Sequence, residues 1–118
     1  MRAVRISPSR DVLRAGLTLT PHHDAPVIPP SAMRVLDATV NRTTRSGVVL
    51  DPDQCLSVFE GLKTLTTWAA YQCFEEREKG SLVPGKGADL TVLAADPLQA
   101  PPWELHRIEV VETLKEGR

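Results

Sequence analysis

The chain has 118 residues, 42% of them hydrophobic and 25% charged, with a formal net charge of −1, which is the composition of a soluble globular segment. This length suits one small domain and is too short for a complete barrel enzyme. Balanced charge without a basic tract argues against a nucleic-acid partner. No apolar run approaches the roughly 20 residues of a membrane span, and the charged N-terminus lacks a secretory apolar stretch, so we expect a cytoplasmic protein.

The two cysteines offer neither a redox motif nor a zinc motif. Cys55 and Cys73 are separated by 17 residues, which fits no CxxC pair, and two thiols make no disulfide framework. We therefore expect both to be small buried apolar residues.

The N-terminal quarter reads as helix, glycine and strand. Ser7-Pro8 suits a helix start and Gly16 its end, and residues 17–20 alternate leucine with threonine, which predicts a short strand. The next segment, residues 21–30, has four prolines and cannot be regular structure. This order is typical of an α/β unit.

Helices are expected in the middle of the chain. Apolar residues spaced at i, i+3 and i+7 predict a helix over residues 31–45, ended by Gly47. Residues 51–54 suit a capped helical turn, and Ser57 with Glu60 makes a capping box for a further helix. Thr66-Thr67 is expected to split that stretch in two, with the charged run 75–79 as its solvated end.

The last 40 residues change character. Three glycines and a proline in residues 80–87 predict a hairpin turn, and residues 90–93 and 108–114 read as strands. The Walker spacing and its final Lys-Ser/Thr are absent, so the glycine-rich run is no phosphate loop. The chain thus divides into a mainly helical segment, 1–78, and a β segment, 79–118.

One cluster carries the chemistry that this sequence offers. His22, His23 and Asp24 follow the expected strand at once, where functional loops of barrel folds converge. Imidazole and carboxylate groups ligate zinc-like ions, and a carboxylate beside a metal can take a proton from water. The competing interpretation is a polar surface loop, since adjacent side chains of an extended backbone point in opposite directions. A zinc site needs three or four protein ligands, and His106 lies more than 80 residues away, so this chain alone is not expected to complete one.

Two separated motifs resemble the metal-dependent amidohydrolase superfamily. Residues 79–93, KGSLVPGKGADLTVL, with Asp96-Pro97 after them, resemble the run that closes many of its members. The segment 22–27, HHDAPV, is similar to the signature of the eighth barrel strand. Residues 41–47 and 57–62 also resemble the branch called amidohydrolase 3, or YtcJ-like.

The resemblance implies a fold and a role for each site residue. The α/β chain would comprise the last βα units of a TIM-like (β/α)8 barrel in residues 1–78 and C-terminal strands of a small composite β-sandwich in residues 79–118. Asp24 matches the strand-eight carboxylate that contacts the catalytic metal, most often zinc, and acts as base toward its water. His22 and His23 would be neighbours of the site or part of the substrate loop. The implied substrate is a small molecule with an amide or another C–N bond.

The departures from the family lead to further expectations. The His-x-His pair of the first strand and the later histidine strands have no counterpart here, so the chain resembles the tail of a larger enzyme and is expected to be inactive alone. One alternative is a non-catalytic interaction or regulatory protein built from the same fold end, and another is a remnant without a function of its own. In each case, helices without their barrel strands should expose apolar surface, which leads either to self-association, as in a homo-oligomer, or to partial order.

Overall fold

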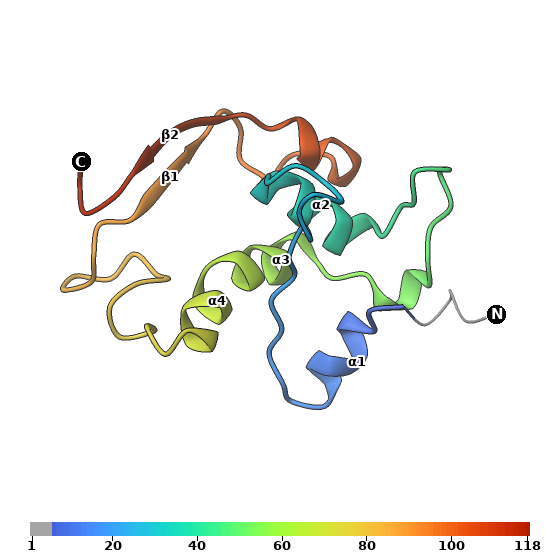
Figure 1. Cartoon of the computed structure of the whole chain (residues 1–118), viewed down its shortest axis with the longest axis horizontal. Helices are drawn as coiled ribbons and strands as arrows, with labels where there is room; N and C mark the ends of the chain where they lie inside the picture. The colour runs from blue at the N-terminus through green and yellow to red at the C-terminus, as the bar shows by residue number, and fades with distance from the viewer. Residues whose placement is uncertain (1–5) are drawn as a thin grey trace.

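The computed structural model describes residues 6–118. Short helices joined by loops make up most of it, and a two-stranded hairpin lies at the end opposite α1 (Figure 1). The helical segments, with η marking a 3-10 helix, are α1 (Ser9–Arg14), α2 (Ala32–Asn41), η2 (Pro52–Gln54), α3 (Val58–Leu65), α4 (Thr67–Gln72) and η3 (Pro102–Arg107). The strands are β1 (Leu90–Leu93) and β2 (Val110–Leu114).

Helix α2 is the centre of the small hydrophobic core. Ser31 caps it by accepting a 3.3 Å hydrogen bond from the backbone N–H of Arg34. The predicted helix over 31–45 is shorter than expected, because Arg42 already adopts the left-handed conformation that ends it. The buried apolar cluster joins one face of α2 to η3, and its members are Met33, Leu36, Val40 and Leu105. Residues from both predicted segments, 1–78 and 79–118, therefore share this core.

The predicted capping box at the start of α3 is confirmed. Ser57 Oγ accepts from the backbone N–H of Glu60, and the Glu60 carboxylate accepts from the backbone N–H of Ser57. The predicted split at Thr66-Thr67 is confirmed as well, since Thr66 has a non-helical backbone between α3 and α4. Gly61 lets α3 approach α2 closely, because a Cβ at this position would lie 2.6 Å from Leu36 Cδ1.

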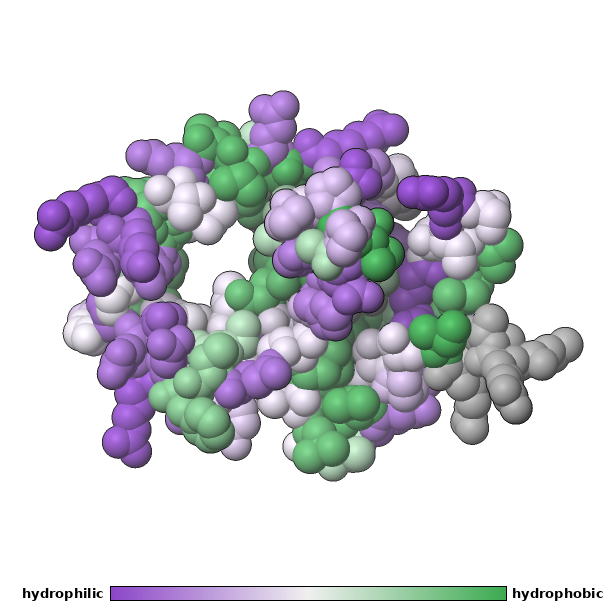
Figure 2. All heavy atoms as spheres, viewed as in Figure 1, coloured by the Kyte–Doolittle hydropathy of each residue, from purple (hydrophilic) through white to green (hydrophobic). Residues whose placement is uncertain are grey.

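The two predicted C-terminal strands form an antiparallel hairpin, with β2 beginning at Val110, two residues later than expected. Leu90 pairs with Leu114, and a register shift follows Val92. Within residues 6–118 each strand has a single neighbour, so each keeps one unpaired edge. A cleft of about 340 Å³ between β1 and the helices has mainly apolar walls, and Figure 2 shows an opening through the molecule beside the hairpin.

Four local predictions were wrong. The glycine-rich residues 80–87 form no hairpin turn between paired strands, because they lie between α4 and β1, and residues 94–109 connect β1 to β2. Residues 17–20 form no strand, because no neighbouring strand offers them backbone partners, and the Thr20 hydroxyl instead contacts the Gln72 side chain at the end of α4. The charged run 75–79 lies in turns after α4 has ended. Neither cysteine is buried: Cys73 follows the last helical residue of α4 and is exposed, and Cys55 is partly exposed.

The aromatic residues lie outside the buried core. Four of the five lie on α3, on α4 and in the turn after α4, and we call this set the aromatic surface: Phe59, Tyr71 and Phe74, which are exposed, and Trp68, which is half-buried. The Lys63 ammonium joins two of them, at 4.6 Å from the ring centre of Phe59 and 5.9 Å from that of Trp68. Phe74 is 93% exposed. Large apolar side chains are thus exposed, but the apolar face of α2 that was expected to lack a partner is buried in the core. No helix in the described part of the chain is long and apolar enough to cross a membrane.

Candidate functional site

Asp24 stands at the first position of a tight turn in the proline-rich loop. Its backbone is left-handed, with φ of 52°, a conformation that aspartate tolerates better than most residues. The backbone N–H of Val27 donates a 2.8 Å hydrogen bond to the Asp24 carbonyl and closes the turn, in which the Ala25-Pro26 peptide bond is cis. The Asp24 side chain is exposed to solvent. The loop therefore presents this carboxylate outward.

The two histidines of the loop differ in their surroundings. His22 is exposed, and its Nδ1 accepts a 3.1 Å hydrogen bond from the backbone N–H of Asp24. His23 is half-buried. The structure thus brings the imidazole ring of His22 into contact with the backbone of Asp24.

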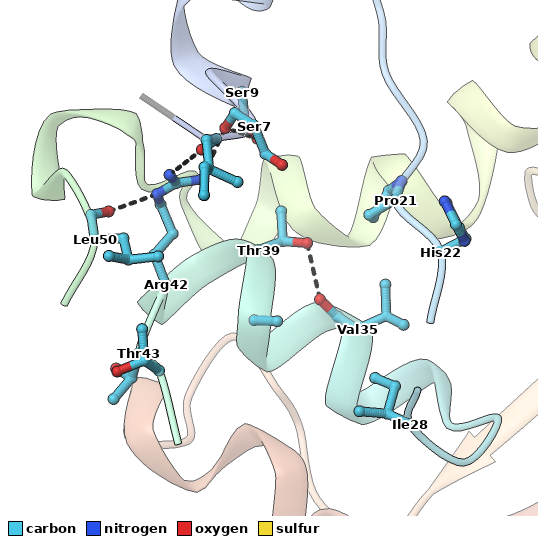
Figure 3. A pocket seen from close by; sticks show the side chains of 13 residues that line it. Ser7, Ser9, Pro21, His22, Ile28, Val35, Thr39, Arg42, Thr43 and Leu50 are labelled. Atoms are coloured by element: carbon cyan, nitrogen blue, oxygen red, sulfur yellow. Dashed lines mark hydrogen bonds between the residues drawn. The ribbon is translucent and has the colours of Figure 1, made fainter. Parts of the chain in front are cut away.

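A cleft of about 300 Å³ lies beside this loop (Figure 3). Pro21, His22 and Ile28 contribute to its lining, and the face of α2 that includes Val35 and Thr39 forms the facing wall. Asp24 is not among the lining residues. The cleft therefore brings His22, but not the carboxylate, to a concave surface large enough for a small molecule.

The guanidinium of Arg42 at this cleft is occupied by the backbone. Its Nε donates to the carbonyl of Leu50 at 2.7 Å, and its two terminal nitrogens donate to the carbonyls of Ser7 and Ile6. These contacts attach the segment before α1 to the end of α2. Arg42 therefore acts here as a structural clamp.

His106 belongs to a different contact. Its Nδ1 lies 3.3 Å from Asp37 Oδ1, across the packing of η3 on α2. Asn41 Nδ2 donates to the same carboxylate oxygen at 3.0 Å and to the carbonyl of Pro102 at 2.7 Å. This histidine therefore holds two elements of the fold together.

The donor groups described here do not fit a complete metal site. Within residues 6–118 no three side chains of histidine, cysteine, aspartate or glutamate gather where an ion could bind them together. A zinc ion takes three or four protein ligands, and the loop offers one outward carboxylate with a histidine whose Nδ1 is already engaged. The identification of Asp24 as a metal ligand and base stays a prediction.

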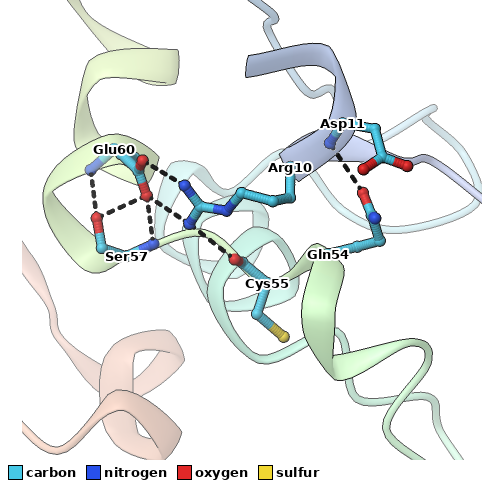
Figure 4. A network of polar contacts seen from close by, with 6 residues as sticks. All are labelled: Arg10, Asp11, Gln54, Cys55, Ser57 and Glu60. Atoms are coloured by element: carbon cyan, nitrogen blue, oxygen red, sulfur yellow. Dashed lines mark hydrogen bonds and ion pairs between the residues drawn. The ribbon is translucent and has the colours of Figure 1, made fainter. Parts of the chain in front are cut away.

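Sequence reasoning missed the strongest polar network of the molecule (Figure 4). The Arg10 guanidinium on α1 donates to both carboxylate oxygens of Glu60, at 2.6 and 2.8 Å, and to the carbonyl of Cys55 at 3.0 Å. The hydrogen bond from Arg10 lowers the pKa of Glu60 to about 2, although partial burial raises it. The capping box pointed to Glu60, but nothing in the sequence pointed to a partner 50 residues away.

Comparison with known proteins identifies the family. A sequence model described as "Amidohydrolase family" matches residues 1–118. The chain is 31% identical over 114 residues to the "N-substituted formamide deformylase" of Arthrobacter pascens, covering 97% of this chain and 21% of that protein. It is 28% identical over 112 residues to the "Putative amidohydrolase YtcJ" of Bacillus subtilis (strain 168), covering 92% and 21%.

No solved structure matches the chain. The chain spans about a fifth of the length of the curated relatives it matches. The family match, in contrast, extends over every residue and includes both motifs on which the resemblance rested. The chain therefore belongs to the amidohydrolase family.

Proposed function

We propose that the chain is the C-terminal part of a metal-dependent amidohydrolase that acts on amide or other C–N bonds of small molecules. The observation that carries this proposal is the family match over residues 1–118, combined with relatives about five times longer. Asp24 supplies one carboxylate of the active site, as a ligand of a divalent ion, zinc in the simplest case, and as a proton acceptor. Its exposed position on a closed turn supports this role.

The proposed architecture places residues 1–78 at the end of a barrel and residues 79–118 in a composite sandwich. The unpaired edge of β1 supports this division, since isolated two-stranded sheets are marginal and gain stability from further strands. The apolar cleft beside β1, lined by Leu62, Leu65 and Leu93 among others, supports it as well. Additional polypeptide in this cleft would bury apolar surface and pair the strand edge.

The isolated chain is proposed to be inactive. The loop offers the Asp24 carboxylate and the half-buried His23, while Nδ1 of His22 is already engaged. These groups cannot supply the three or four protein ligands of a zinc site. Metal analysis of the purified chain tests this part: we expect well under one equivalent of zinc after dialysis. One equivalent that is lost in Asp24→Asn would show that the chain completes a site by itself.

A chimera tests the role of Asp24. Residues 1–118 replace the matching 21% of the Arthrobacter deformylase, and hydrolysis of an N-substituted formamide is measured. We expect Asp24→Asn to lower kcat at least a hundredfold, because asparagine is no proton acceptor at neutral pH. The matched control is Asp53→Asn, which alters an exposed carboxylate in η2 and should leave the rate unchanged.

The chimera also has a clear negative outcome. If it folds and hydrolyses the formamide equally well with Asp24 and with asparagine at this position, Asp24 has no part in the reaction. Zinc content of both chimeras gives a second readout, since loss of a ligand should lower the affinity for the ion.

A further inference from the structure

We infer that His22 is a positioning residue for Asp24, acting through its Nδ1, and that its ring offers a proton rather than a lone pair at Nε2. The positioning role rests on the proposed function of Asp24, whereas the state of the ring rests on the structure alone. The observation is the 3.1 Å contact between His22 Nδ1 and the backbone N–H of Asp24.

The direction of this hydrogen bond defines the tautomer. A backbone N–H can only donate, so His22 Nδ1 must accept and carries no proton. The neutral imidazole then holds its proton on Nε2. A ring nitrogen needs an available lone pair to bind a metal ion. In this conformation the Nδ1 lone pair is engaged by the chain itself, and Nε2 is protonated.

The contact also determines how the carboxylate is presented. A side-chain acceptor that binds the N–H two residues later copies the turn that aspartate and asparagine form with their own backbone. At Asp24 the N–H is held by His22, and the carbonyl is held by the N–H of Val27 at 2.8 Å. Both backbone groups of a left-handed residue are thereby fixed, which fixes the direction of its Cα–Cβ bond.

Two substitutions separate the roles of the ring nitrogens. His22→Asn keeps an acceptor close to the position of Nδ1 and removes everything at Nε2. His22→Gln places its amide one bond further out, where it resembles Nε2, and loses the short-range acceptor. His23→Asn is the matched control, because it changes the neighbouring imidazole and leaves the contact with Asp24 intact.

The first experiment uses the chain as it is. Long-range ¹H–¹⁵N NMR correlation of the imidazoles in their neutral form should show His22 with its proton on Nε2. The exchange rate of the Asp24 amide should rise about fivefold in His22→Gln, the factor that a net hydrogen bond of about 1 kcal/mol gives. It should stay unchanged in His22→Asn and in His23→Asn. A proton on Nδ1 in the unaltered chain would overturn the inference without any variant.

The second experiment measures kcat and KM in the chimera with the deformylase. His22→Gln should lower kcat several-fold with little change in KM. His22→Asn should keep kcat close to that of the chimera with His22. If His22 were needed only for the structure of the loop, the two variants would not differ in this way. The reverse order, with Gln active and Asn impaired, would make Nε2 the working atom and refute the inference. The NMR result needs no catalysis, so it can hold even where Asp24→Asn leaves the chimera active and the proposed function fails.

Discussion

Acid should weaken this fold in part through one ion pair, between Arg10 on α1 and Glu60 on α3. The Arg10 hydrogen bonds hold the pKa of Glu60 at about 2, and the ordinary value is 4.5. The carboxyl group is therefore a stronger acid in the folded chain than in the unfolded chain. Its contribution to stability is fully present above about pH 5 and is lost as the pH falls toward 2.

The size of this contribution follows from the shift and from the exposure. A shift from 4.5 to about 2 corresponds to an upper limit of about 3.4 kcal/mol, at 1.36 kcal/mol per pKa unit. Both side chains are 26% exposed, so solvent screens the pair, and we expect about 1–2 kcal/mol in practice. By pH 3 roughly half of this should be lost.

Glu60→Gln isolates the effect, because glutamine keeps an acceptor for the capping box and has no charge to titrate. Urea unfolding followed by far-ultraviolet circular dichroism gives the free energy at pH 7 and pH 3. The unaltered chain should lose about 1 kcal/mol more than Glu60→Gln over this interval. Glu75→Gln, which removes an exposed pair with Lys79, should behave like the unaltered chain. Equal losses in the unaltered chain and in Glu60→Gln would refute the reasoning.

Three further outcomes are expected. Gly61→Val should destabilise the chain by at least about 2 kcal/mol in the same urea assay, because the valine side chain would overlap the fully buried Leu36. An unchanged urea midpoint would contradict the close approach of α3 to α2. Lys86→Met should speed amide exchange in residues 76–81, because the Lys86 ammonium donates hydrogen bonds to two backbone carbonyls and a hydroxyl in this segment. Exchange as slow as in the unaltered chain would show that these hydrogen bonds do not hold the segment. Phe74→Ser should reduce self-association of the chain in sedimentation velocity, because it removes the most exposed ring of the aromatic surface; a chain that is already monomeric at high concentration would rule this out.

Local signals in the sequence predicted the local structure well. The capping box at Ser57, the break at Thr66 and the hairpin strands depend on neighbouring residues or on alternation, and the structure contains all of them. Failure came where an element needs a distant partner. Residues 17–20 have the composition of a strand, but a strand forms only where another strand offers its backbone, and no strand within residues 6–118 does so for them.

The candidate site shows the same division. The family motif pointed to Asp24, and the structure shows an outward carboxylate on a closed turn. The hydrogen bond from the Asp24 backbone N–H to His22 Nδ1 could not be predicted from the sequence. It depends on the left-handed backbone of Asp24, a conformation that aspartate tolerates but that its presence does not require. The ion pair of Arg10 was equally hidden, since a separation of 50 residues has no periodicity to reveal it.

The position of the tryptophans decides how unfolding of this chain can be observed. Trp103 is 70% exposed, whereas Trp68 is half-buried, with the Lys63 ammonium 5.9 Å from its ring centre. Indole emission shifts to longer wavelength when water reaches the ring, so Trp103 should emit in the folded chain much as it does in the unfolded chain. Any change of intrinsic fluorescence on unfolding should therefore come mainly from Trp68, even though the core around Leu36 contains no tryptophan.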